Sequence, residues 1–190
     1  MVPVGAGSAG PVTAITQLAL LWGVLRCEEC DYKYDLALAG QVSALARHYV
    51  AEYAEPLTSD PAALRRRGTP QLWSPLEYAC HVRDVLLVQR ERLLAARRSD
   101  SPVTEPMGRD ERVEHDGYID QEPADVARQL HDAALLFAHG LDRLGPEDWE
   151  RTLSVPYPEI AVRTLSWFAV HTLHELRHHL LDIRRQLEHA

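Results

Sequence analysis

Four stretches of this sequence carry apolar residues at intervals of three and four, the spacing of one face of an α-helix. These stretches cover residues 35–55, 75–98, 123–144 and 163–189. No stretch of comparable length alternates apolar and polar residues as a half-buried strand would. The pattern therefore predicts an all-α chain that folds as a four-helix bundle with long connections.

The second stretch has the clearest start signal in the chain. Ser74 can cap a helix, Pro75 suits the first helical position, and Glu77 three residues after the serine completes a capping box. Pro56 is expected to end the first helix, and Gly145-Pro146 to stop the third.

Two connections are long. Residues 99–122 hold Ser, Pro, Gly and many charges without periodicity, which predicts a long loop, and loops of this length in a compact domain are often functional. Residues 150–162 contain Val155-Pro156-Tyr157-Pro158 and are expected to be extended rather than helical.

Length, charge and cysteine usage exclude several classes of protein. A chain of 190 residues suffices for one domain with a continuous core, and its net charge of −8 argues against a nucleic-acid binder. The apolar run from Ala14 to Leu25 is too short to span a bilayer, and it lacks the features of a secretory signal. Three cysteines do not make a disulfide framework, so a reducing, cytoplasmic location is expected.

The sequence predicts two regions in the chain. Residues 1–30 are expected to form an N-terminal extension with a Cys-x-x-Cys pair, of which residues 1–26 are poorly ordered or loosely docked. Residues 31–190 are expected to form the bundle.

The fourth stretch is rich in side chains that can bind a metal or take part in catalysis, because it has four histidines and two acidic residues from His171 to Asp182. Glu175 and His179 lie one helical turn apart beside the apolar stripe. A buried carboxylate next to a buried imidazole is costly unless something compensates both, and a divalent cation would do so. The pair therefore predicts a metal site.

A third ligand is expected from the second stretch, where the apolar neighbours Tyr78 and Val85 place His81 on or beside the buried face. Bundle metal sites are built in this way, from side chains of facing helices. Imidazole and carboxylate ligands suit zinc first, with nickel, iron and manganese as alternatives. Three protein ligands would leave a coordination position for water or substrate.

The remaining candidate residues receive other interpretations. His171 and Asp182 could orient the ligands, whereas His174 and His178 fall further round the helix and are expected to be solvated. For the Cys-x-x-Cys pair, a zinc half-site completed elsewhere, a redox pair and two idle thiols are equally open. Cys80 is expected to be packed in the core.

Two motifs in this order resemble those of the DinB/YfiT-like superfamily, which also contains the mycothiol-dependent maleylpyruvate isomerases. The motifs are Trp73-Ser74-Pro75-Leu76-Glu77-Tyr78-Ala79-Cys80-His81 and His171-x-x-x-Glu175-x-x-His178-His179-x-x-Asp182-Ile183.

The resemblance covers about residues 31–190. It implies an up-down-down-up four-helix bundle with a metal on one histidine of the second helix and two residues four apart on the fourth. Carried over by motif, the ligands are His81, Glu175 and His179. Many members have three histidines; glutamate in the middle position resembles the isomerase branch. The 190 residues hold no counterpart of the isomerases' additional C-terminal domain, so a different specific activity is expected.

The first hypothesis for function is a metal-dependent thiol S-transferase of the mycothiol type, or an isomerase-like enzyme, acting on a small-molecule substrate or low-molecular-weight thiol. The alternative is a non-catalytic metal-binding stress-response protein in which the metal only staples the bundle, and a third is a metal-free bundle with hydrogen-bonded core histidines. No nucleic-acid or membrane partner is expected, and a homodimer is the expected assembly if the chain self-associates.

Overall fold

Four long helices dominate the computed structural model, which describes residues 26–156 and 160–188. They are α2 (Val42–Ala51), α4 (Pro75–Arg98), α6 (Pro123–Asp142) and α7 (Leu165–Glu188). Each lies within one of the four predicted stretches, so the all-α prediction is confirmed. The expectation for residues 1–25 of the N-terminal extension lies outside the described residues.

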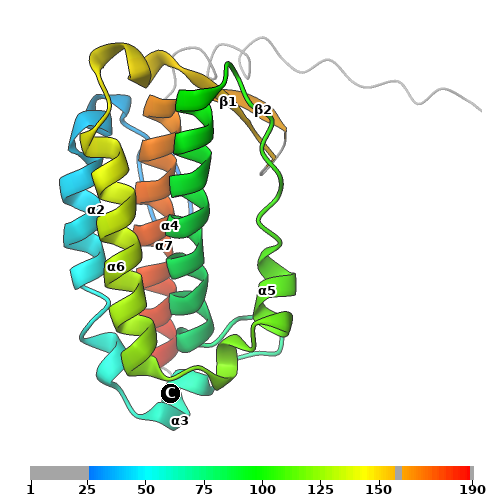
Figure 1. Ribbon diagram of the computed structural model, residues 1–190. Helices are drawn as coiled ribbons and strands as arrows, with labels where there is room; N and C mark the ends of the chain where they lie inside the picture. Colours follow the sequence, from blue (N-terminus) through cyan, green and yellow to red (C-terminus); the bar gives the residue numbers. More distant parts are fainter. Residues whose placement is uncertain (1–25, 157–159, 189–190) are drawn as a thin grey trace, which may run out of the picture.

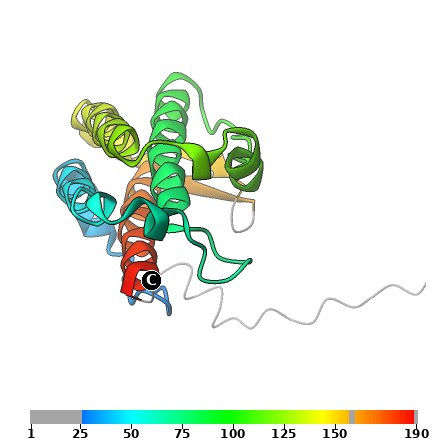
Figure 2. The ribbon, with the colours of Figure 1, turned by 90° about the horizontal axis from the view of Figure 1, so that it is seen from below.

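The helices form a bundle of up-down-down-up topology, as predicted. The chain descends through α2, rises through α4, rises again through α6 and descends through α7 (Figure 1). Seen along the bundle, α4 packs against α6 and α7, and α2 packs against the same two helices (Figure 2). The α4–α7 contact forms the predicted site, because these two helices carry the predicted metal ligands.

The first predicted helix is shorter than expected. Residues Leu36–Gln41 form the 3₁₀ helix η1, which the Asp35 side chain caps by accepting from the amide of Ala37 at 3.0 Å. Gly40 lies in this segment, and glycine disfavours the α-helix. After α2, the chain turns through η2 (Pro56–Thr58) and α3 (Pro61–Arg65) before α4 begins.

The start of α4 is as the sequence predicts. The Glu77 amide donates to Ser74 Oγ at 3.3 Å, and the Ser74 amide donates to Glu77 Oε2 at 2.7 Å. The Glu77 carboxylate is buried and pairs with Arg67. A closed capping box of this kind fixes the first turn of α4, one turn before His81.

The connection between α4 and α6 is more ordered than the predicted loop. It carries α5 (Arg109–His115) and the 3₁₀ helix η3 (Tyr118–Asp120) along the outside of the bundle (Figure 1). None of the α5 side chains is buried, so α5 lies on the surface. Asp84 of α4 holds this connection in place, because its Oδ2 accepts from the Tyr118 hydroxyl at 2.6 Å and from Arg112 Nη1 at 3.1 Å.

The described part of the segment predicted to be extended contributes two short strands after the 3₁₀ helix η4 (Pro146–Glu150), and Tyr157-Pro158 lie outside the described residues. Strand β1 (Thr152–Val155) pairs antiparallel with β2 (Ala161–Thr164), with Thr152 opposite Thr164. The Ser154 amide donates to Pro102 O at 2.9 Å, which ties the hairpin to the α4–α6 connection.

The core runs the length of the bundle between the four helices. The apolar stripe predicted for α7 is buried at Leu165, Phe168, Thr172, Leu176, Leu180 and Ile183. None of the described helices combines the length and apolar character needed to cross a bilayer.

Candidate metal centre

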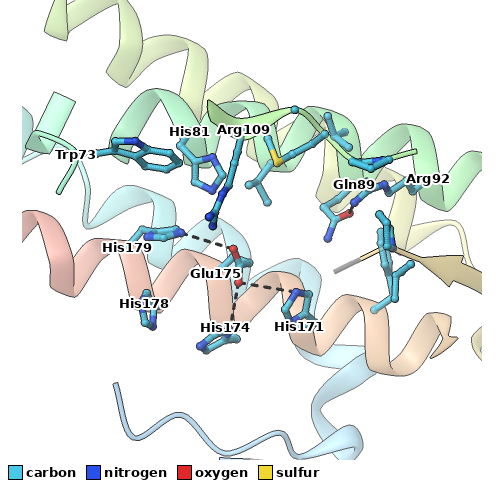
Figure 3. A pocket seen from close by; sticks show the side chains of 18 of the residues that line it. Trp73, His81, Gln89, Arg92, Arg109, His171, His174, Glu175, His178 and His179 are labelled. Carbon is cyan, nitrogen blue, oxygen red and sulfur yellow. Dashed lines mark hydrogen bonds and ion pairs between the residues drawn. The ribbon is translucent and has the colours of Figure 1, made fainter. Parts of the chain in front are cut away.

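The three predicted ligands meet between α4 and α7. One possible donor atom from each of His81, Glu175 and His179 lies within 4.8 Å of the others. His179 Nε2 is 3.6 Å from Glu175 Oε2, and the His81 and His179 rings meet edge to face with centroids 5.0 Å apart (Figure 3). The geometry thus joins residues that are almost a hundred positions apart in the sequence.

A carboxylate orients His179, as expected for Asp182. His179 Nδ1 lies 3.0 Å from Asp182 Oδ2, so the carboxylate accepts a hydrogen bond from Nδ1 and Nε2 faces Glu175. Burial opposes a charge on this ring, but the hydrogen bonds to Asp182 and Glu175 raise the pKa of His179 to about 9. A histidine held by a carboxylate through one nitrogen is typical of metal sites, and a metal bound at Nε2 would displace the proton that this nitrogen carries.

The donor chemistry of the triad fits a divalent metal. Burial and the nearby His179 lower the pKa of His81 to about 3, so its imidazole is neutral, and its Nδ1 has no hydrogen-bond partner among the described residues. Burial disfavours the Glu175 carboxylate, yet the hydrogen bonds from His174 and His179 hold its pKa well below the usual range. One carboxylate and two imidazoles form a ligand set used by zinc and other first-row metals.

The ligands line a pocket of about 650 Å³. One wall consists of α4 and α7 residues. Another consists of Pro106–Arg109 and Glu111 from the α4–α6 connection, together with the end of β1. The pocket also contains two arginines, Arg92 and Arg109, and Figure 3 shows Arg109 pointing toward Glu175. The α4–α6 connection therefore forms part of the wall of the pocket that holds the triad.

His171 lies in the pocket one turn before Glu175. Its Nε2 is 3.8 Å from Glu175 Oε1, its Nδ1 is 2.9 Å from the Tyr34 hydroxyl, and its ring stacks on Trp167 with centroids 4.7 Å apart. Burial lowers the pKa of His171, so the ring is neutral at neutral pH. It can exchange hydrogen bonds with a bound molecule without carrying a charge.

The expectation that His174 and His178 are solvated is wrong. His174 is only 9% exposed, and its Nδ1 lies 2.9 Å from the Tyr34 hydroxyl and 3.3 Å from Glu175 Oε1. His178 is largely covered, and its Nδ1 lies 3.6 Å from Cys27 Sγ. The segment before η1 packs over this face of α7, which the periodicity of a single helix cannot reveal.

The two amino-terminal cysteines come together with these two histidines. Donor atoms of Cys27, Cys30, His174 and His178 lie within 4.8 Å of one another. The signal available in the sequence was the spacing of each half, Cys-x-x-Cys and His-x-x-x-His, without anything to join them. Cys80 is buried as expected, with its thiol 3.8 Å from Tyr118 O.

Known proteins share this architecture. A family model described as the DinB superfamily matches residues 44–183. The fold is similar to that of YfiT from Bacillus subtilis, described as a probable metal-dependent hydrolase with an unusual four-helix bundle topology; the TM-score is 0.65 at 15% identity, over 87% of this chain and 95% of that one.

A mycothiol-dependent maleylpyruvate isomerase is also similar in fold, with a TM-score of 0.63 at 14% identity, over 76% of this chain and 60% of that one. No curated protein matches the sequence.

Proposed function

The chain belongs to the DinB superfamily, and from that premise we propose that it is a metalloenzyme whose metal is bound by His81, Glu175 and His179. We propose zinc as the metal, with nickel, iron or manganese as alternatives. We further propose that the enzyme transfers or isomerises a small molecule with the help of a low-molecular-weight thiol of the mycothiol type.

The observation that carries this proposal is the position of the triad in the wall of the pocket. A structural metal site is closed by four protein ligands, whereas a catalytic site keeps a position open. Here the three ligand residues all line a space of about 650 Å³, within the usual range for small-molecule sites. This arrangement favours the enzyme over the alternative in which the metal only staples the bundle.

When bound, the metal would lower the pKa of a thiol or water and polarise a substrate carbonyl. The chain's own residues would place the substrate. Ionised Glu175 can only accept hydrogen bonds, so His174 Nδ1 carries a hydrogen. Glu175 and the Tyr34 hydroxyl share this hydrogen, so the hydroxyl can donate its own hydrogen to His171 Nδ1. His171 then carries its hydrogen on Nε2, which lies 3.8 Å from Glu175 Oε1 in the pocket and can donate to an oxygen of the substrate.

Two basic side chains in the pocket indicate that the substrate or the thiol carries an anionic group. Arg92 and Arg109 line the same pocket as the triad, and Arg92 Nη1 donates to Gln89 Oε1 at 3.2 Å. Guanidinium groups bind carboxylates through paired hydrogen bonds. Support for a thiol co-substrate comes from the structurally similar isomerase, which is described as mycothiol-dependent.

Metal content of purified variants tests the triad. Without its imidazole, each of His81→Ala and His179→Ala is expected to lose the bundle metal, while His131→Ala, an exposed histidine on α6, keeps it. Glu175→His is expected to retain metal because imidazole can replace the carboxylate, and Glu175→Leu to lose it. Normal metal content in His81→Ala and His179→Ala would contradict the assignment.

The open position needs a separate measurement. Cobalt-loaded protein is expected to change its visible absorption when a low-molecular-weight thiol is added, because the thiolate enters the coordination sphere. The same titration of His81→Ala is the control. If neither thiols nor exchangeable anions change the spectrum, the result would favour a structural metal over a catalytic one.

Location and assembly complete the proposal. We infer a cytoplasmic protein from the free thiols of the three cysteines, and a homodimer is the assembly to test by light scattering. A monomer in that measurement would exclude the dimer and leave the metal site unaffected.

A further inference from the structure

We propose that the chain binds a second metal ion, zinc, through a Cys₂His₂ set that lies beside the first site: Cys27, Cys30, His174 and His178. This ion would fasten the segment before η1 to α7. The proposal goes beyond the function proposed above, and its four ligands are all different residues from the triad.

The two cysteines sit at the ends of a tight turn. Arg26 and Lys33 form an antiparallel bridge, and the Cys27 amide donates to Tyr32 O at 2.8 Å, which closes a small hairpin. Cys27 and Cys30 both belong to the loop of that hairpin, and Cys30 is only 5% exposed. Both cysteines have free thiols. Two cysteines three positions apart in such a turn can bind one ion together.

The two histidines are one turn apart on α7 and face the same loop. Donor atoms of all four residues lie within 4.8 Å of one another. Cys27 Sγ is 3.6 Å from His178 Nδ1. Tetrahedral zinc, with Zn–S and Zn–N lengths of about 2.3 and 2.0–2.1 Å, separates sulfur and nitrogen by about 3.6 Å. One edge of the tetrahedron therefore already has its final length.

Oxygen atoms set the orientation of both imidazoles. His178 Nε2 lies 3.3 Å from Glu29 Oε2 and 3.5 Å from Asp182 Oδ2, so Nε2 carries a hydrogen and Nδ1 can coordinate. His174 Nδ1 faces Tyr34 and Glu175, and its buried Nε2 has no hydrogen-bond partner among the described residues. A buried nitrogen without a partner is costly, and a metal would satisfy it.

The Cys₂His₂ assignment also settles which residues of α7 belong to which ion. Donor atoms of His171, His174 and Glu175 also lie close together, as do those of His178, His179 and Asp182, but each of these groups comes from α7 alone. Assigning His174 and His178 to the cysteines leaves Glu175 and His179 for His81. Each ion then joins α7 to another part of the chain, and no residue serves two ions.

Cys27, His174 and His178 also line the pocket, and the second site differs from the triad in having four protein ligands, which would leave its ion no open position. Thiolate and imidazole together select zinc, and four-coordinate sites of this kind are structural. The ion would hold Tyr34 near His171 and His174, because Tyr34 follows the hairpin directly. Its role is therefore to position the residues next to the first site.

Metal stoichiometry and cobalt absorption test this site without any measurement of activity. Reduced, full-length protein is expected to bind two equivalents of zinc, and the Cys27→Ser/Cys30→Ser and His81→Ala variants to bind one each. With cobalt, the wild type and His81→Ala should show thiolate-to-cobalt charge transfer in the near ultraviolet, and the cysteine variant should not. Cys80→Ser, which changes the one cysteine outside the cluster, is the matched control and should behave as wild type.

The wild-type cobalt spectrum needs no variant to fold, so the test survives if the cysteine variant aggregates. His178→Cys provides a further check, since it should retain two equivalents and add a third thiolate to the spectrum. A single equivalent without charge transfer would overturn the proposal, whether the thiols are idle or form a disulfide on oxidation. A fall from one equivalent to none in the cysteine variant would overturn it too, because the two regions would then share one ion.

Discussion

Asp182 has a special position among the residues near the triad, because it lies between the two neighbouring histidines. Its Oδ2 is 3.0 Å from His179 Nδ1 and 3.5 Å from His178 Nε2. The same carboxylate oxygen therefore faces one histidine of each proposed site. Removing its charge is therefore expected to affect both ions.

Asp182→Asn is expected to weaken zinc binding at the triad by about 10- to 100-fold, the usual effect of losing a carboxylate that orients a ligating histidine. The second site should weaken less, because Glu29 still faces His178. Competition with a chromophoric chelator measures both affinities. Asp132→Asn on the exposed face of α6 is the control, and equal affinities in the two variants would show that Asp182 has no orienting role.

At the scale of elements, the first turn of α4 determines where His81 lies. Glu77 is 1% exposed, and its carboxylate accepts from Arg67 Nε at 2.8 Å as well as from the Ser74 amide. Burial disfavours the carboxylate, but these hydrogen bonds and the Arg67 charge hold the pKa of Glu77 below its ordinary value of 4.5. The charge of Glu77 thus stabilises the folded chain at neutral pH.

Glu77→Gln is expected to lower the free energy of unfolding at pH 7 by about 1.5–2 kcal/mol, the lower part of the range for hydrogen bonds to charged groups. Exposure of the Arg67 side chain, at 38%, limits the effect. A group with a depressed folded-state pKa stabilises above its unfolded pKa and loses that effect as the pH falls through the folded value. The gap between wild type and variant should therefore shrink below pH 4.5.

Urea unfolding at pH 7 and at successively lower pH measures this gap. Glu91→Gln, at an exposed glutamate of the same helix, controls for the loss of a surface charge and should change stability little at any pH. A gap that stays constant down to acid pH would show that the ionised form of Glu77 contributes nothing.

At the scale of the whole molecule, the two proposed ions join parts of the chain that are far apart in sequence. One connects α4 to α7, and the other connects the amino-terminal hairpin to α7 across 151 positions. Both sites exist only in the folded chain. Metal binding should therefore stabilise the fold as a whole.

Zinc at about 1,000 times the dissociation constant is expected to stabilise the protein by about 4 kcal/mol per site. For a chain of this length, each kcal/mol raises the midpoint of thermal unfolding by about 2–4 °C. Calorimetry with added zinc and with a chelator measures the difference. The combined variant His81→Ala/Cys27→Ser/Cys30→Ser should lose most of the response, and a wild type insensitive to both additions would contradict metal binding.

The sequence by itself determined the bundle and the candidate triad. Helical periodicity is local, so the four long helices followed from it, and the Ser74–Glu77 capping box fixed the start of α4 within a few residues. The family resemblance supplied the topology and singled out His81, Glu175 and His179. These residues lie on the inner faces of their helices, and an inner face can be recognised within one helix.

Only the tertiary structure decided what covers the outer part of α7. His174 and His178 have the spacing of a solvated face, and their burial depends on a hairpin more than 130 positions earlier. The partners of Cys27 and Cys30 could not be predicted for the same reason. The spacing of the two cysteines and that of the two histidines can each be recognised in the sequence, but the contact between the two pairs cannot. The same holds for Asp84, whose contacts place the α4–α6 connection over the pocket. Contacts between distant segments arise from packing, and local sequence periodicity does not encode them.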